Sequence, residues 1–151
     1  MSLTRRIARP LLAASFVSGG VETLRNPGPR VEKAESVATK IAEPLPLPQD
    51  TEQLVKINAA VQIGAGLLLG LGRLPRIAAF ALAASLVPTT LAGHPFWEIE
   101  DAGQRAQQKI HFLKNIGLLG GLILAAVDTE GAPSLGWRAK RAAGRVREKV
   151  T

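Results

Sequence analysis

The sequence contains no cysteine and no tyrosine, and four phenylalanines and two tryptophans are its aromatic residues. Without cysteine the chain has no disulfide, no thiolate metal ligand, no iron–sulfur ligation and no cysteine nucleophile. Six aromatic rings also provide too little surface for a platform on which the bases of a single-stranded nucleic acid would stack. Thiol-based chemistry is therefore excluded for this chain, and no nucleic-acid partner is expected.

Charged residues are few and unevenly distributed over the 151 residues. They make up 21% of the chain, and Lys and Arg outnumber Asp and Glu by 19 to 12, which gives a net charge of +7. Residues 57–72 and 77–97 contain no charge at all. Because a transmembrane helix needs about 20 mostly apolar residues, such runs favour membrane spans. We expect four spans at about residues 5–24, 53–72, 76–95 and 109–128, with an external loop over residues 25–52.

A soluble four-helix bundle is the alternative interpretation of the same four segments. A soluble helix carries a charged stripe opposite its apolar face, and the second and third segments have none. Four helices in a chain of this length could not bury such helices on every side. The sequence therefore predicts an all-α integral membrane four-helix bundle, with residues 1–130 as the four-span domain and residues 131–151 as a basic cytoplasmic tail.

The long loop after the first span holds a helix of its own in this interpretation. It begins after the breaker Asn26-Pro27-Gly28-Pro29. Apolar residues then recur at helical spacing within residues 30–43, at Val31, Ala34, Val37, Ala38 and Ile41. This pattern predicts an amphipathic external helix between spans one and two, lying on the bilayer surface or capping the bundle.

The distribution of basic residues predicts the orientation. The N-terminus, the turn at residues 73–76 and the tail carry more Lys and Arg than the opposite side, where acidic residues are in excess. By the positive-inside rule both termini are cytoplasmic. Close helix packing is expected from the Gly-x-x-x-Gly pairs Gly66/Gly70 and Gly117/Gly121.

Polar residues near the spans gather at the outer end in this topology. A one-sided cluster suggests an outward-facing pocket, because independent snorkelling would populate both ends alike. Glu22 is expected to pair with Lys56 or Lys114, and histidine can handle protons near neutral pH. The alternative is structural, with ion pairs and hydrogen bonds that set the helix register. The candidate ligand-binding residues are Glu22, Lys56, Asn58, Gln62, His94, His111, Lys114 and Asn115. No catalytic residue is assigned, and no metal site is expected from two histidines without cysteine.

Several local motifs together resemble the DoxX family of small four-helix bacterial membrane proteins, in the version typical of high-GC actinobacteria. The motifs that carry the resemblance are Ser18–Val21, Arg25–Pro29, Ala65–Gly72, Arg73–Arg76, Gly93–Glu98, His111–Asn115 and Gly120–Gly121. The two histidine-containing motifs are the most specific of these. The resemblance covers roughly residues 5–140.

The resemblance implies a protein of the bacterial plasma membrane linked to redox complexes and oxidative-stress defence. We expect an accessory subunit or anchor, not catalytic alone, with membrane lipid, a redox enzyme and a second copy of the chain as candidate partners. No cofactor is expected to be covalently bound; a quinone or a small sulfur species is the candidate ligand of the outer pocket. The alternatives are a thiosulfate:quinone oxidoreductase-type enzyme subunit and a small transporter or lipid-binding protein.

Overall fold

The computed structural model describes residues 2–42, 48 and 50–129, and these residues form an all-helical structure without strands. The expected basic tail at 131–151 lies outside the described residues. In chain order the elements are α1 (Leu3–Arg25), α2 (Gly28–Ala42), α3 (Thr51–Gly70), α4 (Pro75–Gly93), the short 3-10 helix η1 (Phe96–Glu98) and α5 (Ala102–Val127). The predicted all-α class is confirmed, with five α-helices in the described part of the chain.

Three of the described helical segments are long and apolar enough to cross a membrane: Thr51–Gly70, Pro75–Glu98 (α4 continued through η1) and Ala102–Val127. Helix α1 is 23 residues long, but Arg9 and Glu22 limit its charge-free stretch to residues 10–21. Its crossing of the membrane stays a prediction. The structure thus supports a helical membrane protein with three apolar spans.

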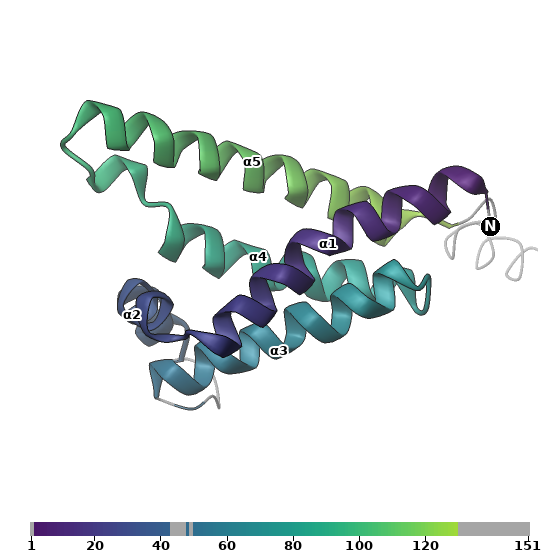
Figure 1. Cartoon of the computed structure of the whole chain (residues 1–151), viewed down its shortest axis with the longest axis horizontal. Helices are drawn as coiled ribbons and strands as arrows, with labels where there is room; N and C mark the ends of the chain where they lie inside the picture. The colour runs from purple at the N-terminus through teal and green to yellow at the C-terminus, as the bar shows by residue number, and fades with distance from the viewer. Residues whose placement is uncertain (1, 43–47, 49, 130–151) are drawn as a thin grey trace, which may run out of the picture.

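The long helices pack in a sequential order. Helix α1 packs along α3, α3 along α4 and α4 along α5, whereas α1 and α5 have little contact. Figure 1 shows α1 and α5 close together near the N-terminus and diverging toward the end that holds α2. We call the two ends of the molecule the basic end (the start of α1, the α3–α4 turn and the end of α5) and the α2 end (α2, η1 and the start of α5).

A tight turn makes α3 and α4 antiparallel neighbours. The amide of Arg73 donates to the carbonyl of Leu68 at 2.8 Å, and that of Gly72 donates to Leu69 at 3.0 Å. This is a Schellman motif, which needs a left-handed residue just after the helix. Gly72 takes that position with φ 69°, so a residue without a side chain ends α3.

Glycines allow α1 and α3 to approach closely. A Cβ atom built at Gly66 would lie 2.7 Å from Val17 Cγ2, and one at Gly20 would lie 2.8 Å from Ile63 Cγ1. Gly70 also faces α1, against Ala13. Because lipid does not drive helices together, such close packing supplies much of their association. Gly66 and Gly70 therefore lie in a helix interface.

The second glycine pair makes less contact. Gly121 faces Leu12 of α1 at 3.6 Å, while nothing described lies within 4 Å of the Cβ position of Gly117. On α5, Leu122 is the buried residue, and the helix touches mainly α4. Most of α5 thus faces outward, and among the described residues no neighbour packs closely against Gly117.

The helix expected within residues 30–43 is present as α2, which contacts α3 and α4. Figure 1 shows α2 nearly end-on, across the direction of the long helices. Ala38 is buried, while the charged residues of α2 stay exposed. The helix therefore caps one end of the molecule.

The last helix is longer than the span expected from the sequence. Apolar residues suggested a span from about residue 109, but α5 begins at Ala102. Asp101 caps it, because its Oδ1 accepts a hydrogen bond from the amide of Gln104 at 2.7 Å. The helix extends past its apolar part, so the glutamines before residue 109 lie on a helix rather than in a loop.

Candidate functional site

A ladder of hydrogen-bonded polar side chains joins α3 to α4. Asn58 and Gln62 lie one turn apart on α3, opposite Ser85 and Thr89 on α4. Gln62 Nε2 donates to Ser85 Oγ at 3.1 Å and to Thr89 Oγ1 at 3.3 Å. Asn58 Nδ2 donates to Thr89 Oγ1 at 3.0 Å, and its Oδ1 accepts from Ser85 Oγ at 2.8 Å.

The ladder leaves its own polar groups satisfied. Gln62 and Ser85 are 7% and 6% exposed, and no buried side-chain nitrogen or oxygen in the described part of the chain lacks a hydrogen-bond partner. A polar group without a partner would be costly in lipid. The four hydrogen bonds all run between α3 and α4, which indicates that the ladder positions α3 against α4.

A second set of polar contacts joins α4 to α5. Asn115 Nδ2 donates to Thr90 Oγ1 at 3.0 Å. His94, which caps the C-terminus of α4, has its Nδ1 2.7 Å from Gln108 Oε1. The rings of His94 and His111 stack with centroids 5.3 Å apart and planes 16° apart. These contacts align α5 with the end of α4.

An aromatic cluster closes the corner between η1 and α5. Phe96 and Trp97 of η1 contact each other edge to face, with ring centroids 5.2 Å apart. Phe112 of α5 contacts both, at 5.3 Å from Phe96 and 5.8 Å from Trp97. Edge-to-face pairs at this separation are favourable for aromatic rings. The cluster holds η1 against α5 and leaves Trp97 half exposed.

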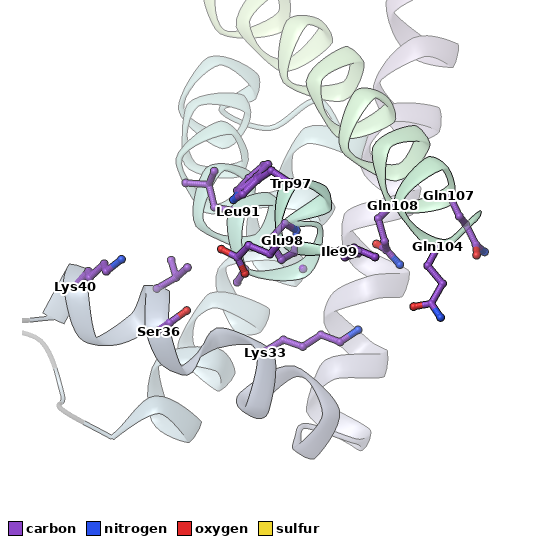
Figure 2. Close-up of a pocket in the computed structure, with 14 residues that line it drawn as sticks. Lys33, Ser36, Lys40, Leu91, Trp97, Glu98, Ile99, Gln104, Gln107 and Gln108 are labelled. Atoms are coloured by element: carbon purple, nitrogen blue, oxygen red, sulfur yellow. The ribbon is translucent and has the colours of Figure 1, made fainter. Parts of the chain in front are cut away.

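Beside this corner lies an open cleft of about 920 Å³. Figure 2 shows its walls, with the side chains of α2 on one side and those of η1 and α5 on the other. The polar and charged residues that line the cleft are Lys33, Ser36, Lys40, Glu98, Gln104, Gln107 and Gln108. Leu91, Trp97 and Ile99 add apolar surface. The cleft therefore combines hydrogen-bond donors with an aromatic wall.

The structure divides the predicted site residues into two groups. Five of them take part in the polar contacts just described: Asn58, Gln62, His94, His111 and Asn115. None of the eight predicted residues lines the cleft. Among these eight residues, His94 is connected to the cleft through a hydrogen bond, because its partner Gln108 lines the cleft. The expected polar cluster exists, but most of it bonds helices together.

The described residues do not form the predicted ion pair between Glu22 and Lys56 or Lys114. Lys56 Nζ lies 2.6 Å from Glu52 Oε1, one turn earlier on the same helix. Glu22 and Lys114 are exposed. Glu22 and Lys114 do not pair because each lies on the side of its helix, α1 or α5, that faces away from the neighbouring helices.

The residues that line the cleft were not among the site residues predicted from the sequence. Lys33, Ser36, Val37 and Lys40 follow the spacing i, i+3, i+4, i+7 and so share one face of α2. That pattern was visible, but it equally describes a solvated face. Three glutamines in the segment before residue 109 were a second signal. Only the fold showed that the two segments face each other.

A further cluster at the basic end was also not anticipated. Asp128, just after α5, accepts from Arg5 Nε at 2.7 Å and from a terminal nitrogen of Arg5 at 3.0 Å. A terminal nitrogen of the buried Arg9 lies 3.4 Å from the same carboxylate. Arg76 Nε donates to the carbonyl of Ala126 at 2.9 Å. These contacts join the start of α1 and the α3–α4 turn to the end of α5.

No group of three or more metal-ligating side chains lies together among residues 2–42, 48 and 50–129. The long apolar helices, the polar contacts between them and the cleft at one end define a polytopic helical membrane protein with a candidate small-molecule site.

The comparison with family models identifies the family. The DoxX model matches residues 5–95, more than half of the chain, and the chain belongs to the DoxX family. The matched range contains the α3–α4 ladder and His94, whereas α5 follows it. Neither curated proteins nor solved structures yield a match.

Proposed function

We propose that this DoxX family protein is an accessory membrane subunit that binds a quinone in the cleft at the α2 end and supports a membrane redox enzyme. The observation that carries the proposal is the cleft itself. Its volume of about 920 Å³ falls in the range of small-molecule sites, about 300–1,000 Å³. The redox association comes from the family resemblance.

The lining of the cleft suits a quinone headgroup. A quinone presents carbonyl oxygens, which accept hydrogen bonds, and a flat ring. The side-chain amides of Gln104, Gln107 and Gln108 and the ammonium group of Lys33 supply donors from the walls. Trp97 supplies an aromatic surface beside them. These groups would bind and orient the headgroup.

The chain's own residues favour a binding role over catalysis. It has no cysteine and no tyrosine, so neither a thiol nor a phenol of this chain could relay electrons. A partner enzyme would carry out the redox reaction while this protein holds the ligand at the membrane. The outward-facing surface of α5 leaves room for such a partner.

We propose further that the protein lies in the bacterial plasma membrane with both termini in the cytoplasm. Arg5, Arg6, Arg9, Arg73 and Arg76 all belong to the basic end, and the positive-inside rule assigns that end to the cytoplasm. The cleft would then open at the outer surface of the membrane.

Binding can be measured by the fluorescence of Trp97. A Trp137→Phe background leaves Trp97 as the single tryptophan, and a 2,3-dimethoxy-5-methyl-1,4-benzoquinone with a decyl chain is titrated into the purified protein in lipid nanodiscs. We expect saturable quenching. The Gln104→Ala variant should bind about two- to tenfold more weakly, since one hydrogen bond contributes about 0.5–1.5 kcal/mol.

A matched control is Gln53→Ala, because Gln53 is an exposed glutamine near the same end of the molecule but outside the cleft. Its affinity should equal that of the background protein. Quenching that does not saturate, or equal affinities of Gln104→Ala and Gln53→Ala, would contradict the proposed site.

The accessory role is tested separately. The protein is purified from native membranes in mild detergent, and the proteins that accompany it are identified by mass spectrometry. A redox enzyme present in stoichiometric amount would support the accessory role.

A small sulfur anion such as thiosulfate is the second candidate ligand. Lys33 and Lys40 both line the cleft and favour an anion, while Glu98 opposes it. Thiosulfate added at constant ionic strength should displace the quinone if it uses the same donors. Displacement that Lys33→Ala abolishes would support this candidate.

A further inference from the structure

A second, smaller cavity adjoins the cleft. It is an apolar groove of about 100 Å³ between α4 and α5. Val87, Leu91, Phe112 and Ile116 line it, and Val87, Leu91 and Ile116 are 46%, 43% and 47% exposed. Both helices are apolar enough to cross a membrane. The groove therefore lies on a surface that lipid chains contact.

The polar groups within the groove are already bonded. Asn115 Nδ2 donates to Thr90 Oγ1, and Thr90 Oγ1 donates to the carbonyl of Leu86 at 2.8 Å. These bonds leave the groove with an apolar surface, which suits a hydrocarbon chain and offers nothing to a small polar molecule.

Two contacts connect the groove to the cleft. Leu91 lines both cavities. Trp97 lines the cleft and Phe112 lines the groove, and their rings lie edge to face with centroids 5.8 Å apart. A molecule with its polar part among the glutamines of the cleft would thus meet continuous apolar surface on passing Leu91 toward the middle of the membrane.

We propose that the site is bipartite and takes a prenylated quinone, with the headgroup in the cleft and the part of the apolar tail next to the ring in the groove between α4 and α5. This inference rests on the proposed function and narrows its ligand class. Thiosulfate has no apolar part and would therefore not occupy the groove between α4 and α5. The cleft lining carries Lys33 and Lys40 against Glu98, so its charge does not distinguish a phospholipid headgroup from a quinone, whereas the flat ring of Trp97 suits the planar quinone ring.

The test fills the groove without touching the cleft. In Val87→Phe a larger side chain occupies the groove at an exposed position of α4, so folding should be retained. The matched control is Ile77→Phe, on the same helix at the basic end and 66% exposed. Each variant is titrated in nanodiscs with the dimethoxy-methyl-benzoquinone carrying a decyl chain and with the same ring without the chain, using Trp97 quenching.

We expect Val87→Phe to bind the tailed quinone about fivefold more weakly, a loss of about 1 kcal/mol that is typical of overpacking. Its affinity for the tail-less ring should be unchanged, and Ile77→Phe should be normal with both. Because each ligand is compared with itself across variants, its partition into lipid cancels.

Each other outcome has a distinct meaning. If Val87→Phe binds the tailed quinone normally, or loses both ligands equally, the tail groove is refuted while the cleft stands. If neither quinone quenches Trp97 of the background protein saturably, the proposed function fails. If phosphatidylglycerol in the nanodisc displaces the tailed quinone and phosphatidylcholine does not, the groove belongs to a lipid and the inference is overturned.

Discussion

The ladder between α3 and α4 offers a quantitative test of what the polar residues contribute. Replacing Gln62 by Leu removes two interhelical hydrogen bonds, to Ser85 Oγ and to Thr89 Oγ1. No donor is orphaned, because Ser85 still donates to Asn58 and Thr89 still donates to the carbonyl of Ser85. Interhelical hydrogen bonds in membranes average about 0.6 kcal/mol, so the expected loss of unfolding free energy is about 1 kcal/mol.

A double-mutant cycle isolates one of these bonds. Gln62→Leu, Ser85→Ala and the double variant are unfolded reversibly in bicelles by titration with dodecyl sulfate, with helicity and tryptophan fluorescence as probes. The coupling energy between Gln62 and Ser85 should be about 0.6 kcal/mol and no more than about 1.7 kcal/mol. Val61→Leu on the lipid-facing side of α3 is the control and should change stability by less than about 0.5 kcal/mol.

The result also separates a structural role from a ligand-binding one. A coupling energy of zero together with an unchanged stability of Gln62→Leu would show that the ladder does not form, and the reasoning would be wrong. Since neither residue lines the cleft, quinone affinity should be unchanged in all folded variants. A loss of affinity without a loss of stability would mean that the ladder is itself part of a binding site.

Two further predictions concern packing and orientation. Gly66→Leu should destabilise the protein by about 1–3 kcal/mol, because its side chain would collide with Val17 of α1; Gly64→Leu, which has open space around it, should be tolerated in the same unfolding assay. In the naturally cysteine-free chain, Ser2→Cys should resist a membrane-impermeant maleimide in intact cells, whereas Gln107→Cys should react. The reverse pattern would place the basic end outside.

The sequence allowed good prediction wherever a feature depends on residues near one another in the chain. Charge-free runs marked α3 and α4, because apolar composition over one span length suffices for insertion. The Asn26–Pro29 breaker marked the end of α1, and helical spacing marked α2. Apolar content predicted a span from about residue 109, whereas the helix that contains it begins at Ala102, because the Asp101 cap sets where the helix starts.

Which of the candidate site residues meet depends on how the helices are rotated about their axes, and the sequence alone does not show this. Asn58, Gln62, His94, His111 and Asn115 were correctly grouped at one end, because depth in the membrane follows from position along a helix. Glu22, Lys56 and Lys114 share that depth but point elsewhere. Depth alone could not distinguish the two groups.

The sequence by itself therefore determined the helices, their antiparallel order and the end at which polar residues gather, because these are properties of local composition and chain connectivity. Only the tertiary structure decided which side chains meet. The helix rotations set by close contacts such as Gly66 against Val17, and by the hydrogen bonds across α3, α4 and α5, brought five of the eight predicted residues into contacts between helices. The same packing placed α2 opposite η1 and the start of α5, and so created a cleft from residues that are far apart in the chain.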